Sequence, residues 1–271
     1  MQTIEKIIKE LEIESKDKQN IFSGFDKIDR YTKGFKPGQL TILGGRHNMG
    51  KSMFAINIVR NLISNKENKI AVFTLEYSAK QWAKLFTKSI NHFTNKEQKL
   101  KNIPPISNQL FIDDTKNISI IDLMEKVTIL KRSENIDFLI VDYLQLISGI
   151  NNNLPTHNEN KFEKTTRLLK VLALGLNIPI LLISSISYRK IKKSRVKNMP
   201  RLSYLKEYGL IENYAEVIFL LHRWDYYEYK KNDRDSDLTN KLELIIAKNE
   251  NGALTGINLE HDPETKTFKE I

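Results

Sequence analysis

The 271-residue sequence contains no cysteine, which excludes disulfide bonds, thiolate zinc sites and cysteine nucleophiles and fits a reducing, cytoplasmic compartment. No apolar run approaches the roughly 18 residues that a membrane-spanning helix requires. The N-terminus carries acidic residues and lacks the hydrophobic segment of a secretory signal. Acidic residues are also outnumbered, with 33 Asp and Glu against 43 Lys and Arg and a net charge of +10. We therefore expect a soluble cytoplasmic protein with no membrane partner, and the charge favours a polyanionic one.

The strongest motif is a glycine-rich loop between an expected strand at residues 39–43 and an expected helix from residue 53 onward. The loop is Gly45-Arg46-His47-Asn48-Met49-Gly50-Lys51-Ser52, which reads G-x-x-x-x-G-K-S. In this setting backbone N–H groups and the helix N-terminus surround the β- and γ-phosphates of a nucleotide. Lys51 would place its charge on the transferred phosphate, and Ser52 would ligate Mg²⁺. A chance glycine turn is the alternative, which this context disfavours.

Two further expected strands end in an acidic residue. Residues 69–75 are nearly all apolar, as in a parallel strand covered on both faces, and Glu76 follows them; residues 138–141 lead into Asp142 in the same way. Ligands of α/β sheets bind at the carboxyl ends of parallel strands. We therefore predict that Glu76 orients and activates the attacking water and that Asp142 holds Mg²⁺ opposite Ser52. A solvated strand end is the alternative for Glu76.

The first 14 residues place Ile4, Ile7, Ile8 and Leu11 on one face of a short amphipathic helix. Such a helix is marginal on its own, so its apolar face needs a cover. It could fold back onto its own domain or dock on a neighbouring subunit, and the residues leave both open.

Other polar residues are assigned to turns and helix caps. Ser78 and Gln81 form an S-x-x-Q capping box that opens a helix. Asp113 and Asp114, which follow a short strand, could form a metal pair. We prefer a structural interpretation, because Ser119 indicates turn and cap chemistry before a helix at residue 120.

The most basic segment follows an expected strand at residues 178–183. It contains Arg189, Lys190, Lys192, Lys193, Arg195, Lys197 and Arg201. Such a run is usually a solvated loop, but one beyond a core strand, on the nucleotide edge of the sheet, also suits contacts with nucleic-acid phosphates. Both interpretations stay open.

The C-terminal part adds expected strands at residues 216–221, 242–248 and 256–259, the last two joined through the turn signal Asn251-Gly252. Residues 224–237 read as an exposed hairpin or loop. Alternating strands and helices followed by a hairpin predict one three-layer α/β domain with a mostly parallel sheet. We place this domain at residues 21–271, after a linker helix within residues 1–20.

Several short strings accompany the phosphate loop. They are Gly24-Phe25 with Ile28-Asp29, Gly34 and Pro37-Gly38; Leu75-Glu76 with Ser78; Ile112-Asp113-Asp114-Thr115; Ile140-Val141-Asp142-Tyr143-Leu144-Gln145-Leu146; Leu202-Ser203 with Leu205, Glu207, Gly209 and Ile211-Glu212; and Ala247-Lys248 with Asn251-Gly252. Together they resemble the C-terminal motor domain of DnaB-type replicative DNA helicases, which has the RecA-like P-loop fold. The resemblance runs from about residue 20 to the C-terminus. The family's N-terminal collar domain is therefore expected to be absent, as in a minimal helicase or a truncated form.

This resemblance implies an ATP- and Mg²⁺-dependent ring hexamer that moves along single-stranded DNA, with primase or a helicase loader as further partners. It matches Glu76 to the family's catalytic glutamate, Asp142 to its Mg²⁺-side aspartate and Lys248 to the lysine that reaches the neighbour's ATP. Residues 205–209, with Lys206, Glu207 and Gly209, match the loop that lines the central channel and holds the DNA backbone. The helix at residues 1–14 matches the linker helix that latches onto the next subunit.

Three residues depart from the family pattern. Glu250 stands where the family has an arginine finger, Ser185 replaces a glutamine that senses the nucleotide, and Lys206 replaces the arginine of the DNA loop. A carboxylate at the finger position would repel the phosphate charge that an arginine neutralises, although Lys248 or Arg223 could compensate. ATP binding is therefore better supported than fast hydrolysis. The alternatives to a helicase are a DNA-binding ring or accessory subunit with weak hydrolysis, and a RecA-like recombinase or signalling ATPase.

Overall fold

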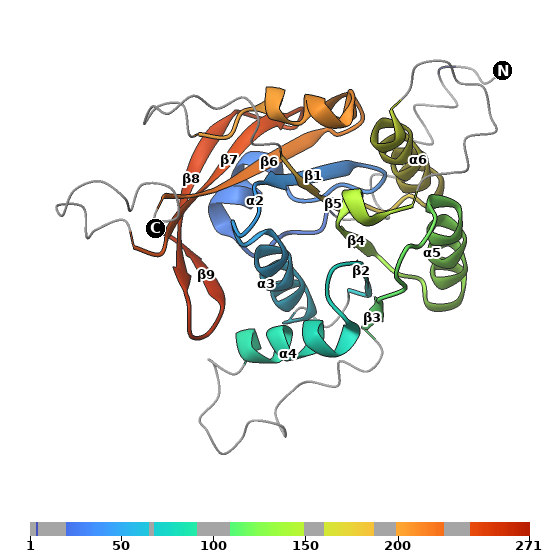
Figure 1. Ribbon diagram of the computed structural model, residues 1–271, viewed down its shortest axis with the longest axis horizontal. Helices are drawn as coiled ribbons and strands as arrows, with labels where there is room; N and C mark the ends of the chain where they lie inside the picture. Colours follow the sequence, from blue (N-terminus) through green and yellow to red (C-terminus); the bar gives the residue numbers. More distant parts are fainter. Residues whose placement is uncertain are drawn as a thin grey trace.

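Long apolar runs form the centre of a nine-stranded sheet in the described part of the chain, with the order β3-β2-β4-β5-β1-β6-β7-β8-β9 (Figure 1). The computed structural model describes residue 4 and residues 20–64, 68–90, 109–148, 160–186, 199–224 and 239–271. The strands are β1 (Leu40–Gly45), β2 (Ile70–Thr74), β3 (Leu110–Asp113), β4 (Phe138–Asp142), β5 (Ile180–Ser185), β6 (Val217–Arg223), β7 (Lys241–Asn249), β8 (Thr255–Asp262) and β9 (Thr267–Glu270). The pairs from β3 to β6 are parallel, and those from β6 to β9 are antiparallel.

Helices cover both faces of the parallel part. They are α2 (Asp26–Thr32), α3 (Lys51–Ser64), α4 (Ala79–Ile90), α5 (Ile120–Glu134) and α6 (Lys161–Leu176). Figure 1 shows α3 and α4 on one side of the sheet and α5 and α6 on the other. The two cores follow this division: Phe54 and Trp82 belong to one cluster, and Leu123 and Leu169 belong to the other. The expected three-layer α/β fold is confirmed.

The parallel strands appear where the apolar runs predict them, and β4 has the predicted end at Asp142. The strand predicted to start at residue 178 begins two residues later, at Ile180. The Ile180 N–H donates to the Gln39 carbonyl, which is where pairing with β1 starts. The predicted last strand at residues 256–259 was too short, since β8 spans Thr255–Asp262. Strand β9 was missed, because its four residues carry a single large apolar side chain, Phe268.

Close approach explains one of the C-terminal glycines. A Cβ at Gly252 would lie 2.4 Å from the Tyr31 carbonyl oxygen. The adjoining Asn249 side chain donates to the same carbonyl at 3.1 Å. The β7–β8 turn thus packs against the end of α2.

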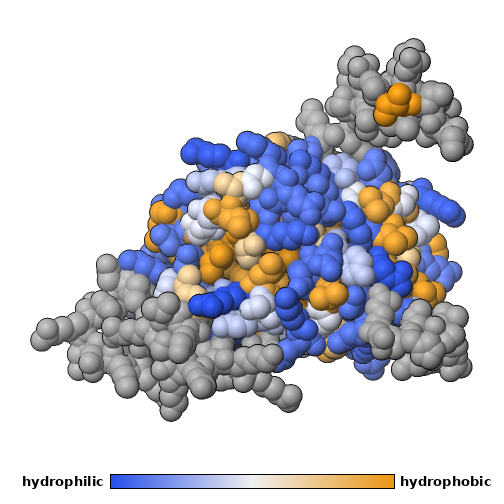
Figure 2. All heavy atoms as spheres, turned by 90° about the horizontal axis from the view of Figure 1, so that it is seen from above, coloured by the Kyte–Doolittle hydropathy of each residue, from blue (hydrophilic) through white to orange (hydrophobic). Residues whose placement is uncertain are grey.

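Some predictions fall outside the described residues. These are the helix at residues 1–14 apart from Ile4, and the excursion at residues 224–237 apart from Trp224. Among the described residues, no helix is both long enough and apolar enough to cross a bilayer. Figure 2 shows a face that is largely hydrophilic, with hydrophobic residues in separate groups.

Candidate nucleotide-binding site

The glycine-rich loop connects the end of β1 to the start of α3, as the motif requires. Asn48 and Gly50 adopt positive φ angles of 61° and 88°, which turn the chain sharply. Lys51 Nζ donates to the Arg46 carbonyl at 2.8 Å, so the lysine side chain bridges the two ends of the loop. A Cβ at Gly45 would lie 3.1 Å from the Leu221 carbonyl oxygen, so any larger residue would press on β6.

The Lys51 ammonium is an unusual cation because it lies largely out of water. Burial lowers its pKa to about 8, although the nearby Asp142 and Glu76 carboxylates oppose this shift. A desolvated cation at a helix N-terminus is well suited to a phosphate group, whose negative charge replaces the lost hydration.

Asp142 and Ser52 face each other across the end of the sheet. The Asp142 side chain is 2 % exposed, and its Oδ1 atom has no hydrogen-bond partner among the described residues. Burial raises the pKa of its carboxyl to about 6, against the effect of a hydrogen bond with Ser52. A buried carboxylate oxygen beside a hydroxyl fits Mg²⁺, whose shell would be completed by phosphate oxygens and water. In the described chain no three His, Asp or Glu residues cluster to hold a metal without such ligands.

Glu76 follows β2 at the same edge of the sheet. Strand β2 pairs with β4 so that Thr74 lies opposite Asp142, and the Leu75 N–H donates to the Asp142 carbonyl at 2.7 Å. The Glu76 side chain is exposed, and its charge acts on both Lys51 and Asp142. The structure therefore brings the predicted Lys51, Ser52, Glu76 and Asp142 to one edge.

Lys248 does not join them. It pairs in register with Ile218 near the start of β6, whereas Gly45 and the loop lie level with Leu221. Its ammonium donates to the Glu212 carbonyl at 3.1 Å and forms an ion pair with Glu250 Oε1 at 3.0 Å. Lys248 thus lies toward the opposite edge of the sheet from its own chain's loop, whereas Arg223, the other candidate cation, is at the far end of β6 on the loop side.

Sequence reasoning missed the residue that ties β4 to β5. Gln145 Oε1 accepts from the Ser185 N–H at 3.1 Å, and Nε2 donates to Ser184 Oγ at 3.0 Å. The signal was present, because Gln145 belongs to the string that follows the β4 aspartate. Its partners on β5 are too distant in sequence to be read from that string.

His222, which packs near the predicted loop residue Arg46, was also missed. The Arg46 side chain is 4 % exposed and His222, on β6, is 2 % exposed. Burial, with the nearby Arg46 charge, lowers the pKa of His222 to about 4, so the imidazole stays neutral at physiological pH. The buried Arg46 therefore adds a further positive charge to the phosphate loop itself.

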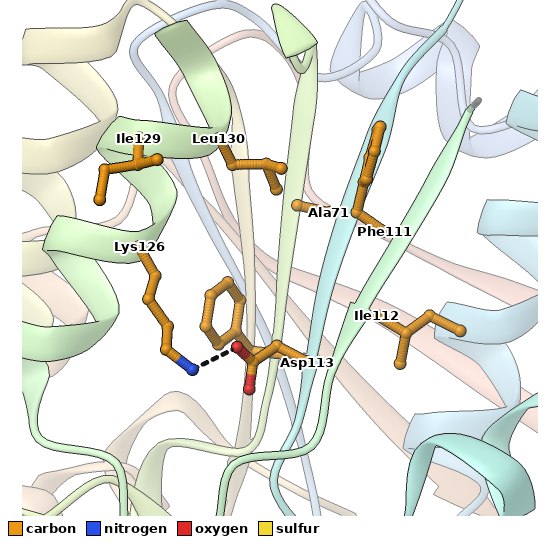
Figure 3. Close-up of a pocket in the computed structure, with 8 residues that line it drawn as sticks. Ala71, Phe111, Ile112, Asp113, Lys126, Ile129 and Leu130 are labelled. Carbon is orange, nitrogen blue, oxygen red and sulfur yellow. Dashed lines mark hydrogen bonds and ion pairs between the residues drawn. The ribbon is translucent and has the colours of Figure 1, made fainter. Parts of the chain in front are cut away.

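The Asp113-Asp114 pair lies apart from the site, and the structure supports the structural interpretation. Asp113 forms an ion pair with Lys126 at 2.6 Å (Figure 3), beside a cavity of about 330 Å³ between β3 and α5. Burial acts to raise the pKa of Asp113, but hydrogen bonds from Lys126 and Thr115 outweigh it and lower the pKa. Ser119 caps α5 as predicted, accepting from the Asp122 N–H. Asp114 instead accepts from Ala79 N–H at the start of α4.

The expected DNA-contacting residues are only partly described. Arg189, Lys190, Lys192, Lys193 and Arg195 lie outside the described residues. Lys206 and Glu207 are exposed on a short 3₁₀ helix, Lys206–Tyr208, which ends at Gly209 with φ of 85°. The next N–H, of Leu210, donates to Glu163 on α6 at 3.1 Å, which anchors this exposed turn.

Comparison with known proteins matches this architecture. The model of the DnaB-like helicase C terminal domain family matches residues 20–270. The replicative DNA helicase DnaB of Geobacillus stearothermophilus is 30 % identical over 259 residues, which cover 91 % of this chain and 55 % of that protein. The chain therefore spans about half the length of this curated relative.

Solved structures agree on the fold. A DnaB-like replicative helicase, whose structure was described with its interactions with primase, has a TM-score of 0.79 and 26 % identity, covering 99 % of this chain and 68 % of that one. A KaiC-like protein of Pyrococcus horikoshii is 16 % identical with a TM-score of 0.63, over 93 % of this chain and 98 % of that one, and shares the fold alone. The expected RecA-like P-loop fold is confirmed.

Proposed function

Because the chain belongs to the DnaB-like helicase C-terminal domain family, we propose that it is the motor of a replicative DNA helicase. It couples ATP hydrolysis to movement along single-stranded DNA as a ring hexamer. The observation that carries the proposal is the meeting of Lys51, the Ser52–Asp142 pair and Glu76 at one edge of the sheet.

Each of these groups has one task in this proposal. Lys51 and the loop N–H groups hold the β- and γ-phosphates, and Ser52 and Asp142 hold Mg²⁺. Glu76 orients the attacking water and accepts its proton. Magnesium, when bound, neutralises charge that develops on the phosphate oxygens.

In this proposal Lys248 acts on the nucleotide of a neighbouring subunit in the ring. In its own chain it lies toward the opposite edge from the loop, so it reaches a nucleotide only if that nucleotide belongs to a neighbouring subunit. The exposed turn with Lys206, Glu207 and Gly209, together with the basic segment before it, would contact DNA in the channel. Likeness to the DnaB-like helicase described with primase extends the proposal to primase, or a loader, as a further partner.

One observation favours a second candidate, an ATP- and DNA-binding ring or accessory subunit with weak or no hydrolysis. Glu250 stands at the expected arginine-finger position and forms an ion pair with Lys248 at 3.0 Å. In that state the cation that we propose to reach a neighbour's phosphates is partly neutralised. An arginine finger contributes about 10³–10⁵ in turnover, so its loss matters.

Steady-state ATPase measured with and without single-stranded DNA separates the two candidates. DNA-stimulated turnover and displacement of a strand from a forked duplex support the motor. Binding of ATP and DNA without turnover supports the accessory ring. The Lys51→Ala variant should lose nucleotide binding and all activity, whereas Lys88→Ala, an exposed lysine on α4, should behave like wild type. Activity that survives in Lys51→Ala contradicts the motor mechanism.

A further inference from the structure

The turn that carries Glu76 is gripped by a loop from the neighbouring strand. The Lys116 ammonium donates to three successive carbonyl groups, those of Leu75 at 2.7 Å, Glu76 at 3.1 Å and Tyr77 at 3.3 Å. Two residues earlier, Asp114 Oδ2 accepts from the Ala79 N–H at 2.8 Å. The Lys116 ammonium therefore holds the carbonyl groups of residues 75–77, and the Asp114 carboxylate holds the N–H of Ala79.

The gripping loop is itself anchored on both sides. At its start, Asp113 Oδ1 accepts from the Thr115 N–H at 2.8 Å, and Lys126 on α5 pairs with Asp113 (Figure 3) and donates to Thr115 Oγ1 at 2.8 Å. At its end, Ser148 Oγ donates to the Asn117 carbonyl at 2.8 Å. The backbone of the loop that carries Asp114 and Lys116 is therefore restrained on both sides of these two residues.

Few other bonds restrain the Glu76 turn. The Leu75 N–H is bound to the Asp142 carbonyl, and Thr74 Oγ1 donates to the Tyr77 carbonyl at 3.2 Å. The capping box of Ser78 and Gln81 holds the start of α4 but not Glu76. Lys116 is an exposed residue, but its ionic hydrogen bonds are stronger than neutral ones and reach three successive carbonyl groups, so they restrain the direction in which Glu76 leaves the backbone.

We infer that Lys116 and Asp114 are positioning residues that aim the Glu76 carboxylate at the reacting phosphate. This inference rests on the proposed function, in which Glu76 activates water. In the described part of the chain, neither side chain forms a hydrogen bond with the phosphate loop or with Asp142. They affect the orientation of the water-activating group and leave nucleotide binding to Lys51 and Ser52.

The test compares Lys116→Met with Lys116→Arg and with Lys80→Met, a control at an exposed lysine in the first turn of α4. A misplaced catalytic group lowers turnover steeply, so we expect kcat of Lys116→Met to fall roughly 10- to 100-fold. The Kd for a Mg²⁺-bound non-hydrolysable ATP analogue should stay at the wild-type value. Lys116→Arg should recover part of kcat, and Lys80→Met should be unchanged. Likewise, Asp114→Ala should lower kcat more than Asp114→Asn, which keeps an acceptor for the Ala79 N–H.

A second readout does not depend on activity. Amide hydrogen exchange in a peptide covering residues 75–79 should be faster in Lys116→Met than in wild type, while a peptide covering the phosphate loop should exchange as before. If wild type turns over ATP and Lys116→Met has the same kcat, the inference is overturned. It is also overturned if the loss of activity in Lys116→Met is explained by a rise in Kd for the nucleotide. Unchanged exchange at residues 75–79 also overturns it. A wild type without turnover overturns the proposed function, and the exchange data then decide whether the grip on the turn is real.

Discussion

Gln145, which follows β4, is hydrogen-bonded to Ser185, the last residue of β5, at the carboxyl edge of the sheet. The Gln145 side chain accepts from the Ser185 N–H at 3.1 Å while its amide group donates to Ser184 Oγ at 3.0 Å. Gln145 lies in the 3₁₀ helix Leu144–Leu146, which follows Asp142, so the segment after Asp142 is tied to the end of β5.

Removing the Gln145 side chain should lower the stability of the protein as well as remove its bond with Ser185. In Gln145→Ala the Ser185 N–H, on a residue that is 5 % exposed, loses its acceptor. We expect a loss of about 1–3 kcal/mol in the free energy of unfolding, the usual cost of an unsatisfied buried donor. Urea denaturation measures it, with Gln145→Glu as a control that keeps an acceptor oxygen. Equal stability of the alanine variant and wild type would contradict the role of this bond.

Replacing Glu250 should raise the rate of ATP hydrolysis. Glu250→Arg removes the ion pair with Lys248 and supplies a guanidinium at the finger position, so DNA-stimulated kcat should rise by roughly tenfold or more. Glu250→Ala, which only frees Lys248, should give a smaller rise. The Glu250 side chain is 54 % exposed, so neither change should disturb the fold. If kcat falls in both variants, Glu250 holds Lys248 in its active position instead.

Magnesium-dependent nucleotide binding should weaken as the pH falls through about 6. Burial raises the pKa of Asp142 to about 6, so the carboxylate that we propose as a Mg²⁺ ligand becomes protonated below that value. Titration of a fluorescent ADP analogue across this range, with and without Mg²⁺, measures the effect. Only the Mg²⁺-dependent part should change, and Asp142→Asn should abolish that part at every pH.

The same shift has a consequence for the stability of the nucleotide-free protein. Between the ordinary pKa of 3.8 and about 6, the native Asp142 holds a proton that the unfolded chain has released. The contribution of this group to the free energy of unfolding therefore decreases as the pH rises through that window. Lys51 acts in the opposite direction, since its lowered pKa makes stability rise between about 8 and 10.5. Thermal melts of wild type and Asp142→Asn across the acidic window separate the Asp142 effect.

Binding to single-stranded DNA should weaken steeply with salt. Each lysine or arginine that contacts a phosphate contributes about 0.7 to the slope of log K against log salt. Arg201→Ala and Lys206→Ala, at exposed positions on either side of Leu205, should each lower the slope by roughly that amount. Fluorescence anisotropy with a labelled oligonucleotide measures the slope, with Lys88→Ala as the control. A flat response to salt in wild type would remove phosphate contacts from the proposal.

Local patterns predicted most of the parallel sheet and the residues at its carboxyl edge. Lys51, Ser52, Glu76 and Asp142 could be assigned because each follows an apolar strand or a glycine turn, and parallel strands end at a common edge. Strand β9 was missed because pairing with β8 and packing of Phe268 on α3, rather than an apolar run, make it a strand. The Lys116 and Gln145 contacts were missed because their partners lie about 40 residues away in the sequence.

The succession of strands and helices along the chain, the phosphate loop and the family resemblance were determined by the sequence alone, because apolar periodicity, glycine spacing and short motifs act over a few neighbouring residues. Only the tertiary structure decided that Lys248 lies toward the opposite edge from the loop and pairs with Glu250, and that a lysine on the β3–α5 loop grips the Glu76 turn. These relationships depend on strand register and on which loops meet at an edge. They arise when the chain packs, because the partners are far apart along it and no local propensity encodes their distance.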